Sequence, residues 1–198
     1  VFDLPTRLFH WLLALSFLGA YVTGDSERWR DLHALFGYTA LVLVVFRIAW
    51  GLVGTRYARL SALRPSPRRA FAYLRSLFTR TPEHHAGHNP AGSLAIVALL
   101  VLTLATSLVG LATLNELGGE WVAELHEGLA NAMLALVLVH VAGVIVGSLA
   151  HGENLPLAMM TGRKKGRPDE AISRPFALVG IALLLLVVAL WTGVLPRP

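Results

Sequence analysis

The chain has 198 residues, of which 55% are hydrophobic and only 15% are charged, and its mean hydropathy is +0.61. This is too apolar for an ordinary soluble domain of that length, so the composition predicts a polytopic membrane protein and argues against nucleic-acid binding despite a formal charge of +5. The chain has no cysteine, which excludes disulfides, iron–sulfur ligation, covalent c-type haem and thiolate zinc sites, so any cofactor must be held by histidine.

Five apolar segments of near-membrane length follow one another along the chain. Pro5 is acceptable at the start of the first helix, and Gly24 ends it. Each segment is close to the length that a hydrocarbon core requires, the first being the shortest. The expected ranges are residues 8–22, 33–53, 91–114, 125–150 and 175–195. The sequence therefore predicts an all-α integral membrane protein.

A long basic connector, residues 55–90, separates the second and third segments and holds seven arginines. Within it, residues 65–78 place apolar side chains such as Phe71 and Leu74 at helical spacing against arginines. That pattern is typical of a helix lying on an anionic membrane surface.

The distribution of lysine and arginine predicts the orientation of the chain. If the N-terminus is cytoplasmic, thirteen of these residues lie inside: Arg7, the seven of the connector and five that follow the fourth segment. Arg28, Arg30 and Arg197 then lie outside. We therefore expect a multi-pass membrane protein with a cytoplasmic N-terminus and a C-terminus on the outer side.

Two histidines, His126 and His140, mark the fourth segment. Fourteen residues correspond to about 21 Å along a helix and fall about 40° short of whole turns, so both side chains leave nearly the same face, one near each membrane surface. A histidine at membrane depth requires a partner. Neutral imidazole is a common ligand of haem iron, so this spacing suggests two haem irons at two depths.

The predicted orientation supplies a partner for each of these histidines. It places His10 of the first segment level with His140, near the cytoplasmic side, and His33 of the second segment level with His126, near the outer side. Each histidine alone could instead be hydrogen-bonded within the bundle or rest at an interface. Two level pairs together favour bis-histidine ligation of two haems.

Several motifs resemble one family. The motif HEGLAN, residues 126–131, followed by His140, resembles the fourth helix of bacterial b-type cytochromes of the cytochrome b561 and nickel–iron hydrogenase b-subunit superfamily. His33, Gly37 and Arg47 match that family's histidine, the glycine four residues later and the arginine fourteen residues later. Three further segments resemble the hydrogenase branch of this superfamily: FDLPTRLFHW, GHNPAG and HGENLPLAMMTGRKK.

The resemblance implies a four-helix bundle that holds two non-covalent b haems, His10 with His140 and His33 with His126. It covers residues 1–166, so we expect a di-haem domain there and, in residues 167–198, a linker and an extra transmembrane helix.

Three further residues are candidates for cofactor binding. Arg47 lies fourteen residues after His33 and hence at the depth of His10. The family match favours a role for Arg47 as partner of a haem propionate, while a snorkelling arginine is the simpler alternative. Arg7 and His88 could also pair with a haem propionate. Each is near the surface, so the interpretation as an ordinary surface residue stays equally open.

The function expected from these features is electron transfer across the bilayer, between a periplasmic redox partner and the quinone pool. Quinone is implied by the resemblance, and electrons could flow in either direction. The expected partners are the lipid bilayer, quinone, a periplasmic c-type cytochrome or a hydrogenase or dehydrogenase subunit, and a second copy of the chain. The protein would then be an electron carrier or a subunit of a quinone-linked oxidoreductase.

Two other functions stay open at this point. One is a transporter whose histidines relay protons or bind a metal, which predicts further polar groups at mid-membrane. The other is a structural anchor of a respiratory complex, in which the histidines are incidental.

Overall fold

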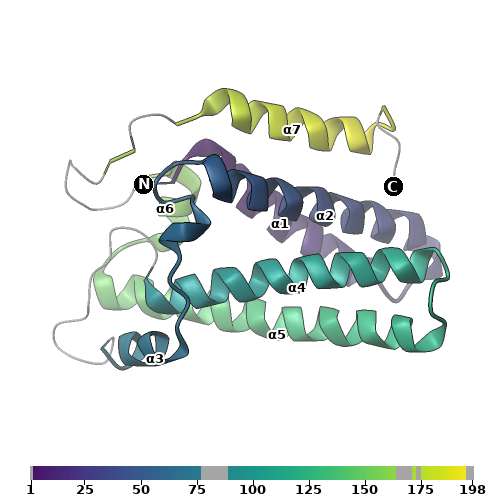
Figure 1. Cartoon of the computed structure of the whole chain (residues 1–198), viewed down its shortest axis with the longest axis horizontal. Coiled ribbons are helices and arrows are strands. Elements are labelled where there is room, and N and C mark those ends of the chain that lie inside the picture. The colour runs from purple at the N-terminus through teal and green to yellow at the C-terminus, as the bar shows by residue number, and fades with distance from the viewer. Residues whose placement is uncertain (1, 77–88, 164–170, 173–174, 195–198) are drawn as a thin grey trace.

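The computed structural model describes residues 2–76, 89–163, 171–172 and 175–194, and its regular structure over these residues is entirely helical (Figure 1). The all-α prediction is confirmed. Two short 3₁₀ turns, Glu27–Trp29 and Leu60–Ala62, accompany the α-helices. The α-helices are α1 (Leu4–Thr23), α2 (Arg30–Val53), α3 (Pro67–Ser76), α4 (Pro90–Leu114), α5 (Glu120–His151), α6 (Leu155–Thr161) and α7 (Ala177–Trp191).

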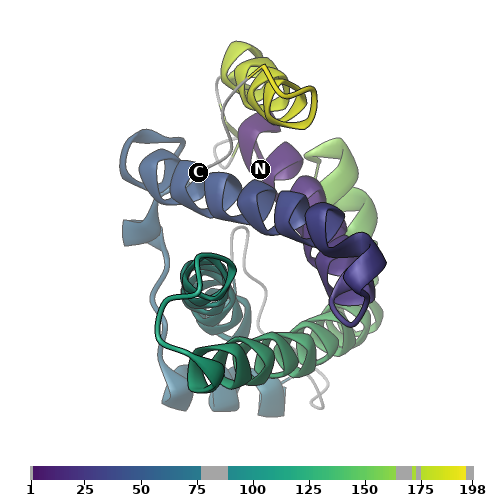
Figure 2. The ribbon, with the colours of Figure 1, turned by 90° about the vertical axis from the view of Figure 1, so that its right-hand side faces the viewer.

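Helices α1, α2, α4 and α5 form the bundle. Helix α1 packs against α2, α2 against α4, and α4 against α5. Seen from the end in Figure 2, these four helices surround a common centre, and α7 lies outside them against α1 and α2. Three of these four helices carry the paired histidines: α1 holds His10, α2 holds His33, and α5 holds both His126 and His140.

Three helical stretches of the described chain are long and apolar enough to cross a membrane: Glu27–Val53, Pro90–Leu114 and Glu120–His151. Helix α7 is apolar but has only 15 residues. Helix α1, with 20 residues, extends the first predicted segment by one turn at its start.

Side chains that precede the helices cap their first turns. Asp3 Oδ1 accepts a hydrogen bond from Thr6 N at 2.9 Å, and Asn89 Oδ1 accepts one from Gly92 N at 2.6 Å. A proline follows each cap, at a position where its missing N–H is not needed. These caps fix the ends at which α1 and α4 enter the bundle.

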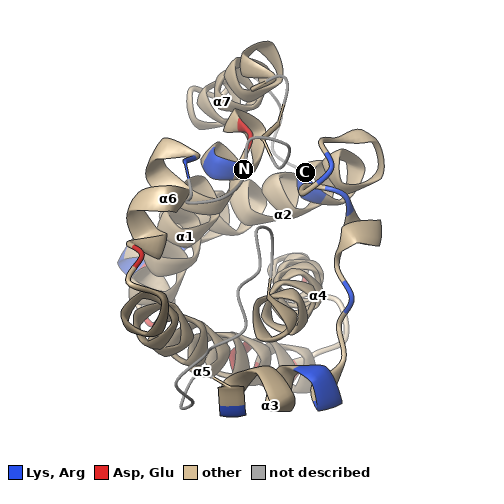
Figure 3. Ribbon diagram, turned by 90° about the vertical axis from the view of Figure 1, so that its left-hand side faces the viewer, with Lys and Arg blue, Asp and Glu red and all other residues tan. Residues whose placement is uncertain are grey.

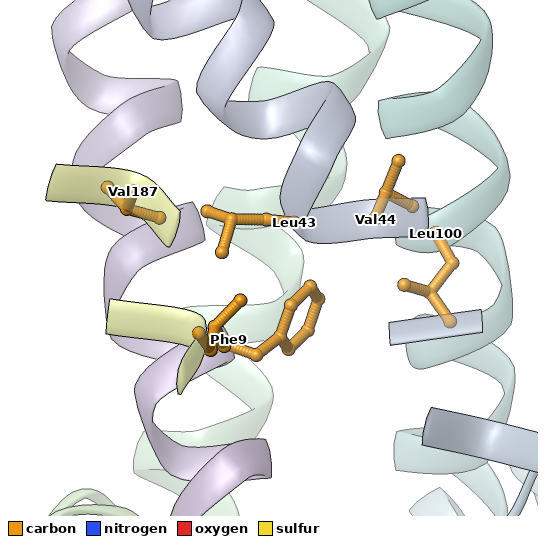
Figure 4. Packing of buried hydrophobic residues seen from close by; sticks show 6 residues of the cluster. Phe9, Leu43, Val44, Leu100 and Val187 are labelled. Atoms are coloured by element: carbon orange, nitrogen blue, oxygen red, sulfur yellow. The ribbon is translucent and has the colours of Figure 1, made fainter. Parts of the chain in front are cut away.

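A cluster of buried apolar side chains joins α1, α2, α4 and α7 (Figure 4). Leu43 and Val44 of α2 are fully buried there. The residues of this cluster are Phe9, Leu43, Val44, Leu100, Leu183 and Val187. The cluster ties α7 to the bundle at mid-height.

One end of the bundle is basic. The start of α1, the end of α2, the segment after it, α3 and α6 all lie at this end, and Figure 3 shows the blue arginines of the described chain around it. Acidic residues dominate the turns at the other end, among them Asp25, Glu27 and Glu116. The two ends therefore differ in charge in the sense that the lysine and arginine count predicts.

Candidate cofactor site

The structure brings the four predicted histidines together in two pairs. The ring centroids of His10 (α1) and His140 (α5) are 6.4 Å apart, with an angle of 57° between the rings. The centroids of His33 (α2) and His126 (α5) are 6.0 Å apart, with the rings at 90°. Because α5 is one continuous helix, the fourteen residues between His126 and His140 separate the pairs by about 21 Å along it.

Backbone carbonyl groups of neighbouring helices hold both rings of the outer pair. His33 Nδ1 lies 2.8 Å from the carbonyl oxygen of Ala20 on α1, and His126 Nδ1 lies 3.0 Å from that of Thr106 on α4. A carbonyl can only accept, so each Nδ1 must carry the proton and donate. In a neutral ring this leaves the lone pair on Nε2, which is the nitrogen that can bind a metal.

A cavity of about 470 Å³ lies beside the outer pair, between α2, α4 and α5. His33, His126 and two glycines, Gly37 and Gly110, are among the residues that line it. A Cβ atom at Gly37 would meet nothing within 4 Å, whereas one at Gly110 would lie 2.7 Å from His126 Cε1. Gly37 therefore leaves space open on the His33 side, and Gly110 makes room for the His126 ring.

The inner pair has unsatisfied polar atoms around it. His10 Nδ1 is buried and has no hydrogen-bond partner within the described part of the chain. The His10 ring also contacts Trp11 edge-on, at 5.0 Å between centroids. A buried ring nitrogen without a partner is costly, so this position suits a group that supplies one.

Arg47 and Arg7 lie at the same end of the bundle as the inner pair. Arg47 is only 3% exposed, interacts electrostatically with Asp3, and has one terminal nitrogen, Nη1, with no partner among the described residues. It is thus buried within the protein rather than extended to its surface. Arg7 donates from Nη2 to the carbonyl oxygen of Met160, at the end of α6. His88 lies outside the described residues.

Both pairs have the separation that a bis-imidazole metal site requires. A metal–nitrogen bond to imidazole is about 2 Å long, and with the distance from Nε2 to the ring centre this puts two opposed ligand rings about 6 Å apart. The observed separations of 6.0 and 6.4 Å match that spacing. The free Nε2 lone pairs of the outer pair, the cavity beside it and the unpartnered His10 Nδ1 fit a haem iron at each pair.

Sequence analysis did not find the acceptors at Ala20 and Thr106 or the role of Gly110. The acceptors are backbone atoms, which every residue has, so no residue type marks them. Gly110 does carry a signal, since a glycine inside an apolar helix suggests a close approach, but only the packing of α4 on α5 identifies the His126 ring as its neighbour.

Comparison with known proteins identifies a family. A family model described as prokaryotic cytochrome b561 matches residues 1–162, which include all four histidines and end before α7.

Curated relatives were also found. A protein of Azotobacter vinelandii named "Probable Ni/Fe-hydrogenase B-type cytochrome subunit" is 30% identical over 52% of this chain and 53% of its own length. One of the same name from Azotobacter chroococcum mcd 1 is 30% identical over 61% of this chain and 62% of its own. A "Probable Ni/Fe-hydrogenase 1 B-type cytochrome subunit" of Escherichia coli K12 is 26% identical over 59% of this chain and 60% of its own length. Each match covers less than two thirds of the relative's length, and no solved structure matched the chain.

Proposed function

The chain belongs to the prokaryotic cytochrome b561 family, and from this premise we propose that it moves electrons from one side of the bilayer to the other through two b haems. Membership makes it a multi-pass membrane b-type cytochrome of electron transfer. The observation that carries the finer proposal is the presence of two facing histidine pairs at two depths of one helix, α5.

His10 and His140 would hold the inner haem, and His33 and His126 would hold the outer haem. A b haem held by two imidazoles would supply reversible one-electron transfer rather than bond chemistry at iron. The carbonyl groups of Ala20 and Thr106 fix the tautomer and the direction of the outer rings. These contacts would keep the outer ligands in place.

Arg47 is the proposed partner of an inner-haem propionate. Its buried guanidinium has an unpartnered nitrogen, and a carboxylate is the group that an arginine fork binds best. Arg7 is a second candidate for the same role, because its Nη2 donates to Met160 while its buried Nε has no partner among the described residues. His88 is a further candidate and lies outside the described residues.

We further propose that the protein lies in the bacterial inner membrane with its acidic end in the periplasm. Relatives named as hydrogenase b-type cytochrome subunits support a hydrogenase-type redox partner there. Acidic side chains at this end would attract a basic surface of such a partner, or of a c-type cytochrome. Quinone is the proposed partner within the membrane.

A visible absorption spectrum combined with a count of haem tests this proposal. The protein is purified in detergent from cells that supply haem, and its haem is measured per chain. We expect a reduced low-spin b-type spectrum, two haems per chain and two components in a redox titration. A folded, monodisperse preparation without haem would contradict electron transfer, and a stoichiometry of one would contradict the two-haem arrangement.

A further inference from the structure

Helix α3 presents apolar and basic side chains to the outside of the protein. Phe71 is 64% exposed and Leu74 is 42% exposed, whereas Tyr73 is 3% exposed. The helix contains three exposed arginines and no acidic residue. An exposed aromatic ring beside arginines, on a helix without acidic residues, matches a surface that is apolar and negatively charged.

Contacts to the two long helices α4 and α5 fix α3 at the basic end of the bundle. The Tyr73 hydroxyl is hydrogen-bonded to His151 Nε2 at 3.1 Å and accepts a hydrogen bond from Asn89 Nδ2, also at 3.1 Å. His151 ends α5, and Asn89 caps the start of α4. Helix α3 therefore lies at the level where the two most apolar membrane-spanning helices leave the bilayer.

The direction of α3 also differs from that of the bundle. In Figure 3, which looks along the bundle, α4 is seen nearly end-on and α3 is seen from its side. A helix that crosses a membrane-spanning helix at its exit lies along the membrane surface rather than through it.

Apolar and basic side chains of α3 are neighbours on one side of the helix. At about 100° per residue, Phe71 lies about 60° from Leu74 and about 40° from Arg75, with Arg68 next to Arg75. Ala72 and Arg69 lie on the other side, about 100° and 160° from Phe71. One side of α3 thus combines two apolar side chains with two cations.

We propose that α3 binds the anionic phospholipids of the leaflet at the basic end of the bundle. Phe71 and Leu74 enter the acyl boundary, and Arg68 and Arg75 pair with phosphate groups. The charge of the helix favours anionic lipid over a neutral bilayer, because each arginine near an anionic surface strengthens binding about fivefold. Through the hydrogen bonds of Tyr73 to His151 and Asn89, α3 also stays attached to α5 and to the start of α4. Lipid and bundle therefore contact different sides of the helix.

Site-directed spin labelling tests the proposal, since the chain has no cysteine of its own. The full chain carrying Phe71→Cys, Leu74→Cys or Ala72→Cys is labelled with a nitroxide and placed in nanodiscs, one chain per disc, of phosphatidylcholine with or without phosphatidylglycerol. With anionic lipid, we expect the labels at 71 and 74 to be relaxed by oxygen and protected from an aqueous nickel complex, and the label at 72 to behave in the opposite way.

Two arginine variants test the role of charge in the Phe71→Cys background. Arg75→Gln should lower the apparent affinity for phosphatidylglycerol about fivefold, whereas Arg69→Gln, which removes an equal charge from the other side, should change it less than twofold. Equal water accessibility of the labels at 71 and 72 in anionic discs would overturn the proposal, as would equal effects of the two arginine variants. Protection that requires two chains per disc would identify a second copy as the occupant instead.

Discussion

Backbone carbonyl groups, not side chains, orient the imidazoles of the outer pair. His33 donates to Ala20 across the contact between α2 and α1, and His126 donates to Thr106 across the contact between α5 and α4. The direction of each ligand therefore depends on how two helices pack. A change that shifts one helix should therefore disturb the proposed haem site without altering either histidine.

Substitution of a single histidine separates the two proposed haems. His140→Ala should remove the inner haem and leave the outer one, because His140 contacts His10 while His126 lies about 21 Å away along α5. The haem content should fall from two to one per chain, as measured by pyridine haemochrome assay. His151→Gln, a histidine outside the pairs on the same helix, is the control and should retain both haems. If His140→Ala instead lost only the component that His33→Ala loses, the pairing would be wrong.

Gly110 tests the contact that shapes the outer site. A Cβ atom there would lie 2.7 Å from His126 Cε1, so Gly110→Ala must displace the ring or the helix. Ligands need to stay within about 0.5 Å of their working geometry, so we expect occupancy of the outer site to fall at least twofold while the inner site remains filled. Redox titration resolves the two components. Gly128→Ala is the matched control on α5, because a Cβ atom there meets nothing within 4 Å, and equal losses in both variants would contradict the role of Gly110.

At the scale of elements, Asp3 joins three parts of the fold. Its carboxylate caps α1 at Thr6 N and accepts hydrogen bonds from Trp50 Nε1, at the end of α2, and from Thr55 Oγ1, in the segment that follows. Asp3 is only 1% exposed and also balances the buried charge of Arg47. One side chain thus sets how α1 and α2 meet at the basic end.

Asp3→Ala should therefore destabilise the protein strongly. Each hydrogen bond to a buried charge contributes about 1.5–3 kcal/mol, and Arg47 would lose its counter-charge, so we expect a loss of about 3–5 kcal/mol in the free energy of unfolding. Denaturant titration in detergent micelles measures it. Asp25→Ala removes an exposed carboxylate and should cost about 0.5 kcal/mol or less. Similar losses of unfolding free energy in the two variants would show that Asp3 does not hold α1 and α2 together.

The apolar segments could be predicted from sequence, but helices α1 and α5 begin four and five residues before the predicted ranges, because caps and polar first turns extend them. Pro5 and Pro90 occupy first turns, and Asp3 and Asn89 are caps that the sequence displays directly. The lateral position of α7 could not be predicted, because its apolar residues are spread around the helix and no periodicity selects a face. Only the packing of Leu183 and Val187 against Phe9 and Leu43 defines that face.

For the whole molecule, the depth of each histidine in the membrane could be predicted from sequence. The lateral contacts that each histidine makes with neighbouring helices could not. Helix rise converts the fourteen residues between His126 and His140 into a depth, and topology assigns each partner a level. Which carbonyl receives each ring, and that Arg47 is buried instead of extending outward, depend on contacts between helices that no single segment contains.

The charge difference between the ends of the bundle predicts its orientation. Cytoplasmic ends of membrane proteins carry the excess of lysine and arginine, and here that end holds α3, α6 and the segment before α3. We therefore expect Ser61, in that segment, to face the cytoplasm and Leu117, in the turn between α4 and α5, to face the periplasm. Because the chain has no cysteine, Ser61→Cys and Leu117→Cys can each be probed with a membrane-impermeant maleimide in intact spheroplasts.

Leu117→Cys should react at once in intact spheroplasts, and Ser61→Cys only after the membrane is opened with detergent. Both side chains are exposed, so a difference in rate reports the side of the membrane and not burial. The opposite labelling pattern would show that the orientation is reversed, with the His10 and His140 pair nearest the periplasm. Electrons from a periplasmic partner would then enter at the end that carries Arg47, so this labelling experiment also decides which histidine pair receives them first.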